Sequence, residues 1–532
     1  MGAGSGPESG GGAESRRPEI DDLESSGPRS RGAARPNGGA WSDHVRTLLR
    51  TNLSERPGGR AVEDTGTHPV NVRRVLDLAL RIGELLLSTG ESAEEVEAAM
   101  LAVALGYGLE RCDTSVLFTI LTISHQATLT EPAWTASRSV RRRVSDYNRL
   151  ASAHALINEI NGGRRSVEEA YGALAEIRRA ADIYPGWLVT AATSFLAGSA
   201  AVLVGGGWLV FLTACVAALL GGELARQLAV RGLPEFYQFV VAAMPAAGIG
   251  MLLDVLDVDV RTSAVITGGL FALLPGRALV ASVQDGLTGF YINSVARLFE
   301  VLYIAVAIIC GVALVLHLGL RFGVSLDAGA VAAIPTRPFL QLLASAALAL
   351  TYGILLQVRR LILLYVTFGG AAAWACAGAI GDAGFPRVLA ILATTVLIGL
   401  GGQLAARHSE TSGLPFTIPI LCPLLPGSAT YLGLLSIVDG KRGLGFSYLF
   451  TAASLALALA VGVNLGGELA RLLLPARPGR INRLRPGLPW VGVGIGGGGG
   501  NGGRGLGLGS GRRDQGGGLG SRGLGLSGRR RD

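Results

Sequence analysis

The sequence predicts a mainly α-helical polytopic membrane protein, with about ten transmembrane helices in an inverted 5+5 repeat and a small α+β cytoplasmic domain before them. Three observations support this fold class. Of the 532 residues, 49% are hydrophobic and only 16% are charged. The apolar residues are concentrated between Trp187 and Pro475. Within that region the tetrapeptide Leu-Leu-Pro-Gly occurs twice, at residues 273–276 and 424–427.

The two ends of the chain, residues 1–69 and 476–532, are polar and rich in glycine. We expect both tails to be disordered, because neither can bury enough apolar surface to offset its ordering entropy. The formal net charge of +8 does not predict a nucleic-acid partner, since the arginines flank apolar segments without interleaved aromatic residues. Five dispersed cysteines argue against a disulfide framework or a metal cage.

The sequence pattern over residues 70–181 predicts the cytoplasmic α+β domain. Apolar residues at helical spacing indicate a helix over 71–88, which Gly90 ends. Ser92 caps a second helix with Glu95 as its capping-box partner, and Gly106 and Gly108 end it. The β-branched run 115–124 favours one strand, with which 134–144 could pair. Two further helices are expected over 146–161 and 166–180.

Ten apolar stretches follow, each near the ~20 residues needed to cross a bilayer. They form a first membrane half over 186–320 and a second over 337–475. Arginines cluster before the first span and after the last, which places both termini in the cytoplasm and the chain in the cell membrane as a multi-pass protein. The predicted spans are residues 187–204, 208–224, 236–253, 262–283, 298–316, 339–356, 361–380, 388–405, 416–438 and 446–465.

The two Pro-Gly sites fall in the fourth and ninth spans. Proline and glycine interrupt helical hydrogen bonding, so we expect a broken helix at each site. Five crossings separate the two spans, which makes them run in opposite directions and gives an inverted repeat. A competing alignment matches Gly221-Gly222 with Gly401-Gly402 and would give a parallel relation. The shared Asp-Gly that follows each Leu-Leu-Pro-Gly favours the inverted one.

A broken helix exposes backbone donors at the positive end of its second half, where a carboxylate can bind. This predicts a substrate-binding site that could hold a zwitterionic amino acid. The alternative is that the two prolines only kink helices for packing. The candidate substrate-binding residues are Pro275, Gly276, Arg277, Pro426, Gly427 and Ser428.

Ionisable groups near these spans are candidates for ion coupling, because a charge within the membrane is costly to keep. They are Asp285, Glu300 and Asp439. Glu300 could exchange a proton if burial raises its pKa. The alternative places Asp285 and Arg297 at the membrane interface, with Glu300 paired to Arg297 three residues away on the same helix face.

Five glutamates surround Gly90 in the predicted domain, and His68 and His125 are the nearest histidines noted there. Their alternation with apolar positions favours a solvated helix face over a regulatory or catalytic site, and no metal-ligand spacing is visible. The absence of a Walker loop excludes ATP-driven transport by this chain alone, so we expect an ion gradient as the energy source and no cofactor. The glutamates are Glu84, Glu91, Glu94, Glu95 and Glu97.

Three features of the sequence carry a family resemblance: residues 78–97, Gly-Tyr-Gly-Leu at 106–109, and the two Leu-Leu-Pro-Gly sites. With these features the chain resembles the threonine/serine exporter (ThrE) family over about residues 70–474. The resemblance implies ten spans, a cytoplasmic N-terminal domain and proton-driven export of threonine and serine. Split relatives are associated with dicarboxylates, so a succinate-like exporter is the alternative. The rival class is a membrane-anchored enzyme or sensor. We expect no enzymatic activity. The expected partners are the small-molecule substrate, protons and the lipid bilayer. The sequence leaves open whether the chain forms a homo-oligomer.

Overall fold

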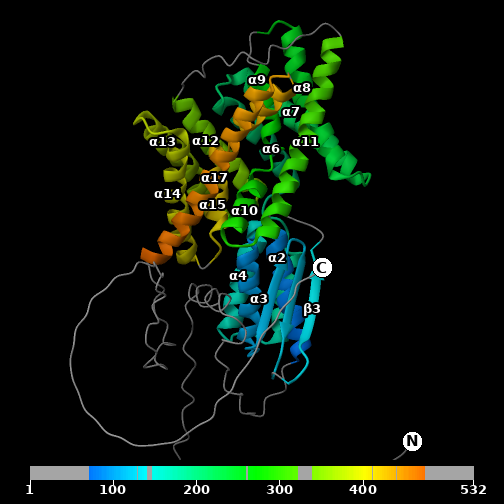
Figure 1. The fold of residues 1–532 in the computed structure, drawn as a ribbon, viewed down its shortest axis with the longest axis vertical. Helices are drawn as coiled ribbons and strands as arrows, with labels where there is room; N and C mark the ends of the chain where they lie inside the picture. The colour runs from blue at the N-terminus through cyan, green and yellow to red at the C-terminus, as the bar shows by residue number, and fades with distance from the viewer. Residues whose placement is uncertain are drawn as a thin grey trace, which may run out of the picture. The chain divides into compact units, whose positions relative to one another are not determined.

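The computed structural model describes residues 71–128, 130–140, 146–258, 262–321, 338–409, 411–438 and 440–473. Figure 1 shows two kinds of structure in this part of the chain: an N-terminal domain, coloured blue to cyan, and a bundle of apolar helices, coloured green to orange. The chain is therefore mainly α-helical, with one small sheet. The predicted tails lie outside the described residues.

The N-terminal domain, which we define as α2 to α5 with the sheet between α3 and α4, has the predicted α+β composition. Its three strands form an antiparallel sheet in the order β1-β2-β3. Apolar faces of the helices and strands share one core. The elements are α2 (Val72–Thr89), α3 (Ala93–Gly106), β1 (Cys112–Leu117), β2 (Ile120–His125), β3 (Trp134–Ser139), α4 (Tyr147–Asn161) and α5 (Val167–Arg179).

The helix boundaries in this domain follow from local capping chemistry. The side chains of Asn71, Ser92, Asp146 and Ser166 each accept a hydrogen bond from a backbone N–H in the first turn of the helix that follows. Gly90 ends α2 with a φ of 99°, a conformation that glycine adopts without a steric penalty. These helices match the predicted ones to within a few residues.

The prediction of a single strand over 115–124 is wrong, because β1 and β2 form a hairpin within that run. Phe118 makes the turn at a φ of 50°, in the left-handed region. Its N–H donates to Oδ1 of Asn293 at 2.7 Å, and Nδ2 of Asn293 donates to the carbonyl of Val116 at 3.1 Å. Asn293 belongs to α11 (Tyr291–Arg321). A distant membrane helix thus binds a turn that carries no glycine or asparagine of its own.

Eight helices of the described chain are long and apolar enough to cross a membrane. They begin close to the predicted spans, although α11 begins seven residues before the predicted residue 298. The other two predicted spans are interrupted and are described below. The eight helices are α6 (Gly186–Leu203), α7 (Trp208–Val230), α8 (Glu235–Val255), α11, α12 (Pro338–Leu355), α13 (Arg360–Asp382), α14 (Arg387–Ser409) and α17 (Arg442–Leu473).

Each Pro-Gly site separates two helices. In the first half, α9 (Thr262–Phe271) ends before Pro275, and α10 (Gly276–Leu287) begins after it. In the second half, α15 (Leu414–Leu421) continues into the 3₁₀ turn η1 (Cys422–Leu424), and α16 (Gly427–Val438) begins after Pro426. Proline lacks the N–H that a continuous helix needs, so the ladder is interrupted at matching positions of the two halves.

The two halves share one packing order. Helix α9 packs against α6, α7 and α8, and α15 packs against α12, α13 and α14. After the breaks, α10 packs against α11 and also against α17 of the other half, while α16 packs against α17 and also against α11. Helix α10 ends against the N-terminal domain at Asp285, whereas α15 begins against that domain, just after Ser412. The two broken segments therefore run in opposite directions relative to the domain (Figure 1).

Candidate functional site

The two breaks lie directly against each other. A Cβ atom added to Gly276 would lie 2.6 Å from Cδ1 of Leu425, the residue before Pro426. A Cβ added to Gly427 would lie 2.9 Å from the ring of Phe271, at the end of α9. Each glycine thus provides the space that a residue of the other break occupies. Glycine is required here for close approach.

The backbone has the same local geometry at both breaks. The N–H of Gly276 donates to the carbonyl of Leu274 at 2.8 Å, and the N–H of Gly427 donates to the carbonyl of Leu425 at 2.8 Å. The prolines then accept the first helical hydrogen bonds of α10 and α16, at 3.1 and 3.0 Å. The first N–H groups of an α-helix have no acceptor within that helix and carry the positive end of its dipole. Two such helix starts meet at this crossing.

The structure brings together four of the six predicted substrate-binding residues. Pro426 and Gly427 are buried at the crossing, and Pro275 and Gly276 are half-buried there. Ser428 is half-buried in the first turn of α16. Arg277 takes the matching place in α10, but its side chain is outside the described part of the chain. Asp439 also lies outside the described residues.

Asp285 and Arg297 form a buried ion pair beneath the N-terminal domain. Their side chains are joined at 3.2 Å between Oδ2 and Nε, and the two residues are 0% and 6% exposed. Oδ1 of Asp285 accepts from the N–H of Ala93 at the start of α3, at 3.4 Å. The burial of both side chains contradicts the alternative in so far as it has them snorkel outward, while their depth in the membrane and the pairing of Glu300 with Arg297 stay predictions. The domain covers them, because α11 begins early enough to place Arg297 under α3.

Glu300 is half-buried on α11, three residues beyond Arg297. It borders a shallow apolar hollow together with Phe118, Phe299 and Tyr303. Phe299 and Tyr303 are largely exposed on this outer face of the bundle. The residues that line this hollow belong to α11 and to the hairpin turn at Phe118, and not to the crossing of the two breaks.

Glu91 joins the domain to the second membrane half. Its Oε2 lies 3.4 Å from Nε2 of His154, its Oε1 accepts from the hydroxyl of Ser412 at 3.4 Å, and its carbonyl accepts from Nη2 of Arg297. Glu91 and His154 are each 5% exposed. Burial alone would lower the pKa of His154, but the hydrogen bond and charge of Glu91, together with the charge of Glu95, outweigh it and raise that pKa.

The interpretation of the five glutamates as a solvated face is wrong for most of them. Glu91 is buried, and Glu97 accepts a 2.7 Å hydrogen bond from the N–H of Val116 in β1. Glu84 accepts from Arg138 and Arg178, at 2.7 and 2.6 Å. Helical spacing could not show that a sheet and a set of membrane helices cover these positions. His154, which sequence reasoning missed, carries no spacing signal in α4.

A polar cavity of about 160 Å³ lies where the N-terminal domain meets the membrane helices. The domain contributes carboxylates and an imidazole from the start of α3 and from α4. The membrane helices contribute amides, hydroxyls and two guanidinium groups. The charged and amide-bearing side chains are Glu91, Glu94, Glu95, His154 and Asn158 from the domain, Gln284 from α10, Gln403 and Arg407 from α14, and Asn464, Glu468 and Arg471 from α17.

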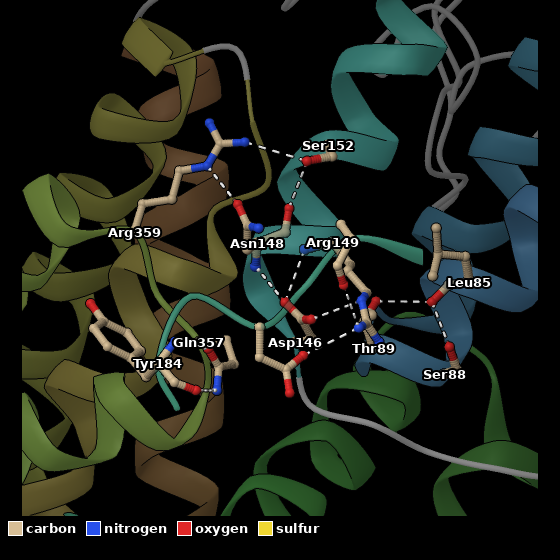
Figure 2. A network of polar contacts seen from close by, with 12 residues as sticks. Leu85, Ser88, Thr89, Asp146, Asn148, Arg149, Ser152, Tyr184, Gln357 and Arg359 are labelled. Carbon is tan, nitrogen blue, oxygen red and sulfur yellow. Dashed lines mark hydrogen bonds and ion pairs between the residues drawn. The ribbon is translucent and has the colours of Figure 1, made fainter. Parts of the chain in front are cut away.

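A second contact fastens the domain to the turn between α12 and α13 (Figure 2). The side-chain amide of Gln357 accepts from the N–H of Tyr184 at 3.0 Å and donates to its carbonyl at 3.4 Å. The hydroxyl of Tyr184 donates to the carbonyl of Val358. Arg359 donates to Asn148 at 3.0 Å, close to the start of α4. The segment that leads into α6 is therefore held by the second membrane half.

Comparisons with known proteins agree on one family. Residues 77–319 match the family model described as "Putative threonine/serine exporter", and residues 341–467 match that described as "Threonine/Serine exporter, ThrE". The chain is 32% identical over 441 residues to a probable threonine/serine exporter of Mycobacterium tuberculosis, covering 80% of this chain and 82% of that protein. It is 31% identical over 452 residues to a threonine/serine exporter of Corynebacterium glutamicum, covering 83% and 91%. No solved structure matches the chain.

Proposed function

Because the chain belongs to the threonine/serine exporter family, we propose that it exports threonine and serine across the cell membrane as a secondary transporter, with the crossing of the two broken helices as the substrate site. One observation carries the proposed site: Gly276 and Gly427 each lie against a residue of the opposite break. Two helix starts therefore meet within the bundle, where they can face one solute together.

The chemistry of the crossing suits an amino-acid carboxylate. Backbone donors at the starts of α10 and α16 favour an anion. In this proposal Arg277 and Ser428, in the first turns of these helices, add a cation and a hydroxyl, while Pro275, Gly276, Pro426 and Gly427 keep the helices open. A substrate hydroxyl would be recognised by the same polar backbone.

The two halves of the bundle support an inverted repeat with alternating access. Their helices follow the same packing order, and their broken segments run in opposite directions relative to the domain. Pairing α9–α10 with α15–α16 favours this relation over the parallel alignment of Gly221 with Gly401. We propose that both termini are cytoplasmic, which places the N-terminal domain on the side from which substrate is exported.

We further propose proton coupling, with Asp285, Glu300 and Asp439 as the candidate groups. For Asp285 the support is its complete burial and its pairing with Arg297. A buried carboxylate needs a cationic partner to stay ionised. Protonation of Asp285 would therefore weaken its ion pair with Arg297, which links α10 to α11. For Glu300 the support is its place beside an apolar surface of α11.

The test uses the full chain in inverted membrane vesicles, with vesicles that lack the protein as the control. We expect uptake of labelled threonine under an imposed proton gradient, competition by serine and little competition by succinate. Arg277→Ala should raise the KM for threonine. Threonine uptake that does not depend on the gradient would contradict proton coupling, and uptake of succinate instead of threonine would contradict the proposed substrate.

A further inference from the structure

We propose that the polar cavity between the N-terminal domain and the membrane helices is a separate entry site, which binds the zwitterionic end of the amino-acid substrate before the substrate reaches the crossing of the broken helices. The ammonium group would face the glutamates at the start of α3, and the carboxylate would face Arg407 and Arg471. This inference rests on the proposed function and assigns the domain a role in binding.

The cavity adjoins the crossing of the broken helices from the side of the domain. Val280 lines it and lies one turn beyond Gly276, roughly 6 Å along the axis of α10 at about 1.5 Å per residue. Thr417 of α15 lines it from the other broken segment. The cavity wall at Val280 is thus one helical turn from Gly276, where the two breaks meet.

The cavity is large enough for a small solute. Its volume of about 160 Å³ is far above the ~10–15 Å³ that one water molecule needs. Hydroxyl and amide groups line it, including Thr411, Gln403 and Asn464. A cavity with this lining is hydrated, and water can be exchanged there for a polar ligand.

The two signs of charge come from different parts of the chain. Glu94 and Glu95 lie in the first turn of α3, and the buried Glu91 precedes them. Arg407 lies near the end of α14, and Arg471 lies near the end of α17, where it pairs with Glu468 at 2.6 Å. A ligand with one positive and one negative end can meet both groups at once.

Two buried polar side chains hold the acidic wall in place. His154 lies against one oxygen of Glu91, and Ser412 donates to the other. These contacts tie the start of α3 to α4 and to the residue before α15. Because the wall is attached to one of the broken segments, movement of that segment would change the cavity that the domain closes.

The test is equilibrium binding of labelled threonine to the full chain in detergent micelles. N-acetylthreonine, which lacks the ammonium, and threoninamide, which lacks the carboxylate, serve as competitors. Replacing Glu94→Gln and Glu95→Gln together should weaken threonine binding about tenfold or more, as expected for loss of charged hydrogen-bond partners. Binding of N-acetylthreonine should change little. Arg407→Gln should weaken the binding of threonine by a similar factor and leave the binding of threoninamide unchanged.

Matched controls carry the same chemical change elsewhere. Glu110→Gln alters an exposed glutamate of the domain, and Arg387→Gln alters an exposed arginine at the other end of α14. Both should bind threonine as the wild type does. If the glutamate pair and Arg407 variants also bind normally while the wild type exports threonine, the cavity proposal is overturned and the proposed function stands. A wild type that neither binds nor exports threonine contradicts both.

A labelling experiment covers the case in which a charge variant fails to fold. Gln284→Cys places a thiol on the cavity wall without changing a charge, and the wild type provides the background of native cysteines. We expect saturating threonine to slow modification of this thiol by a water-soluble reagent at least several-fold. Equal rates with and without threonine would overturn the proposal.

Discussion

Glu97 should make the stability of the N-terminal domain depend on pH in an unusual direction. Burial is the main cause that raises the pKa of this carboxyl from 4.5 to about 7; the hydrogen bond from Val116 opposes it, and the nearby charges of Asp113 and Glu94 add to it. The native state therefore keeps the proton of Glu97 at pH values where the unfolded chain has released it. Stability must then fall as pH rises from about 4.5 to about 7 and stay lower above that.

The magnitude follows from the two pKa values. At about 1.4 kcal/mol per pKa unit, the change from 4.5 to about 7 corresponds to a loss of ~3 kcal/mol above pH 7. Glu97→Gln removes the ionisation but keeps an oxygen that can accept from Val116. The variant should match the wild type near pH 4.5 and exceed its stability by up to ~3 kcal/mol above pH 7.

Amide hydrogen exchange of β1 in the full-length protein is the suitable assay, because it reports local opening of the domain. Comparing variant and wild type at the same pH cancels the intrinsic rate. We expect β1 amides of Glu97→Gln to exchange up to about 100-fold more slowly at pH 8 and only about fourfold more slowly at pH 5. Exposed Glu110→Gln is the control. A ratio for Glu97→Gln that is the same at both pH values would refute the reasoning.

Three further predictions concern contacts within the bundle and at its junction with the domain. Asp285→Ala should destabilise the protein by about 3–5 kcal/mol, because it removes the carboxylate that pairs with the buried Arg297 at 3.2 Å. Removing both side chains should cost less. Thermal unfolding in micelles checks this, and an equal or larger loss in the double variant would contradict it. Gln357→Ala should cost about 1–3 kcal/mol by removing two hydrogen bonds to a buried backbone, and unchanged proteolysis of the segment before α6 would count against that. Gly427→Ala should cost about 1–3 kcal/mol and reduce export, because its Cβ would overlap an aromatic ring; Gly443→Ala, where a Cβ meets open space, should have neither effect.

Local chemistry explains what could be predicted from the sequence. The caps at Asn71, Ser92 and Ser166 act within one helical turn, so their neighbours in the sequence are enough to locate the helix starts. The breaks at Pro275 and Pro426 are equally local, since a missing N–H interrupts a helix wherever it falls. Element order and the positions of the interrupted helices could therefore be predicted before any tertiary contact was known.

Contacts between distant segments explain what was missed. The hairpin at Phe118 depends on Asn293, which lies 175 residues later in the chain. The burial of Glu91 depends on Ser412, which lies 321 residues away, and on the facing helix α4. A periodic pattern shows which residues share a helix face, but it does not show what covers that face. The cavity was invisible for the same reason, because its walls come from six separate helices and the loop before α15.

The N-terminal domain holds both halves of the bundle at once: Asn293 of α11 binds its hairpin, and Arg359 and Ser412 bind it from the other half. Two bodies that rock against each other cannot both stay rigidly attached to a third. If the two halves rock against each other during the proposed alternating access, each turnover must loosen one of these attachments and restore it. The domain would slow the transport cycle, and the strength of its weaker attachment would set the rate at which the exporter switches between its inward-facing and outward-facing states.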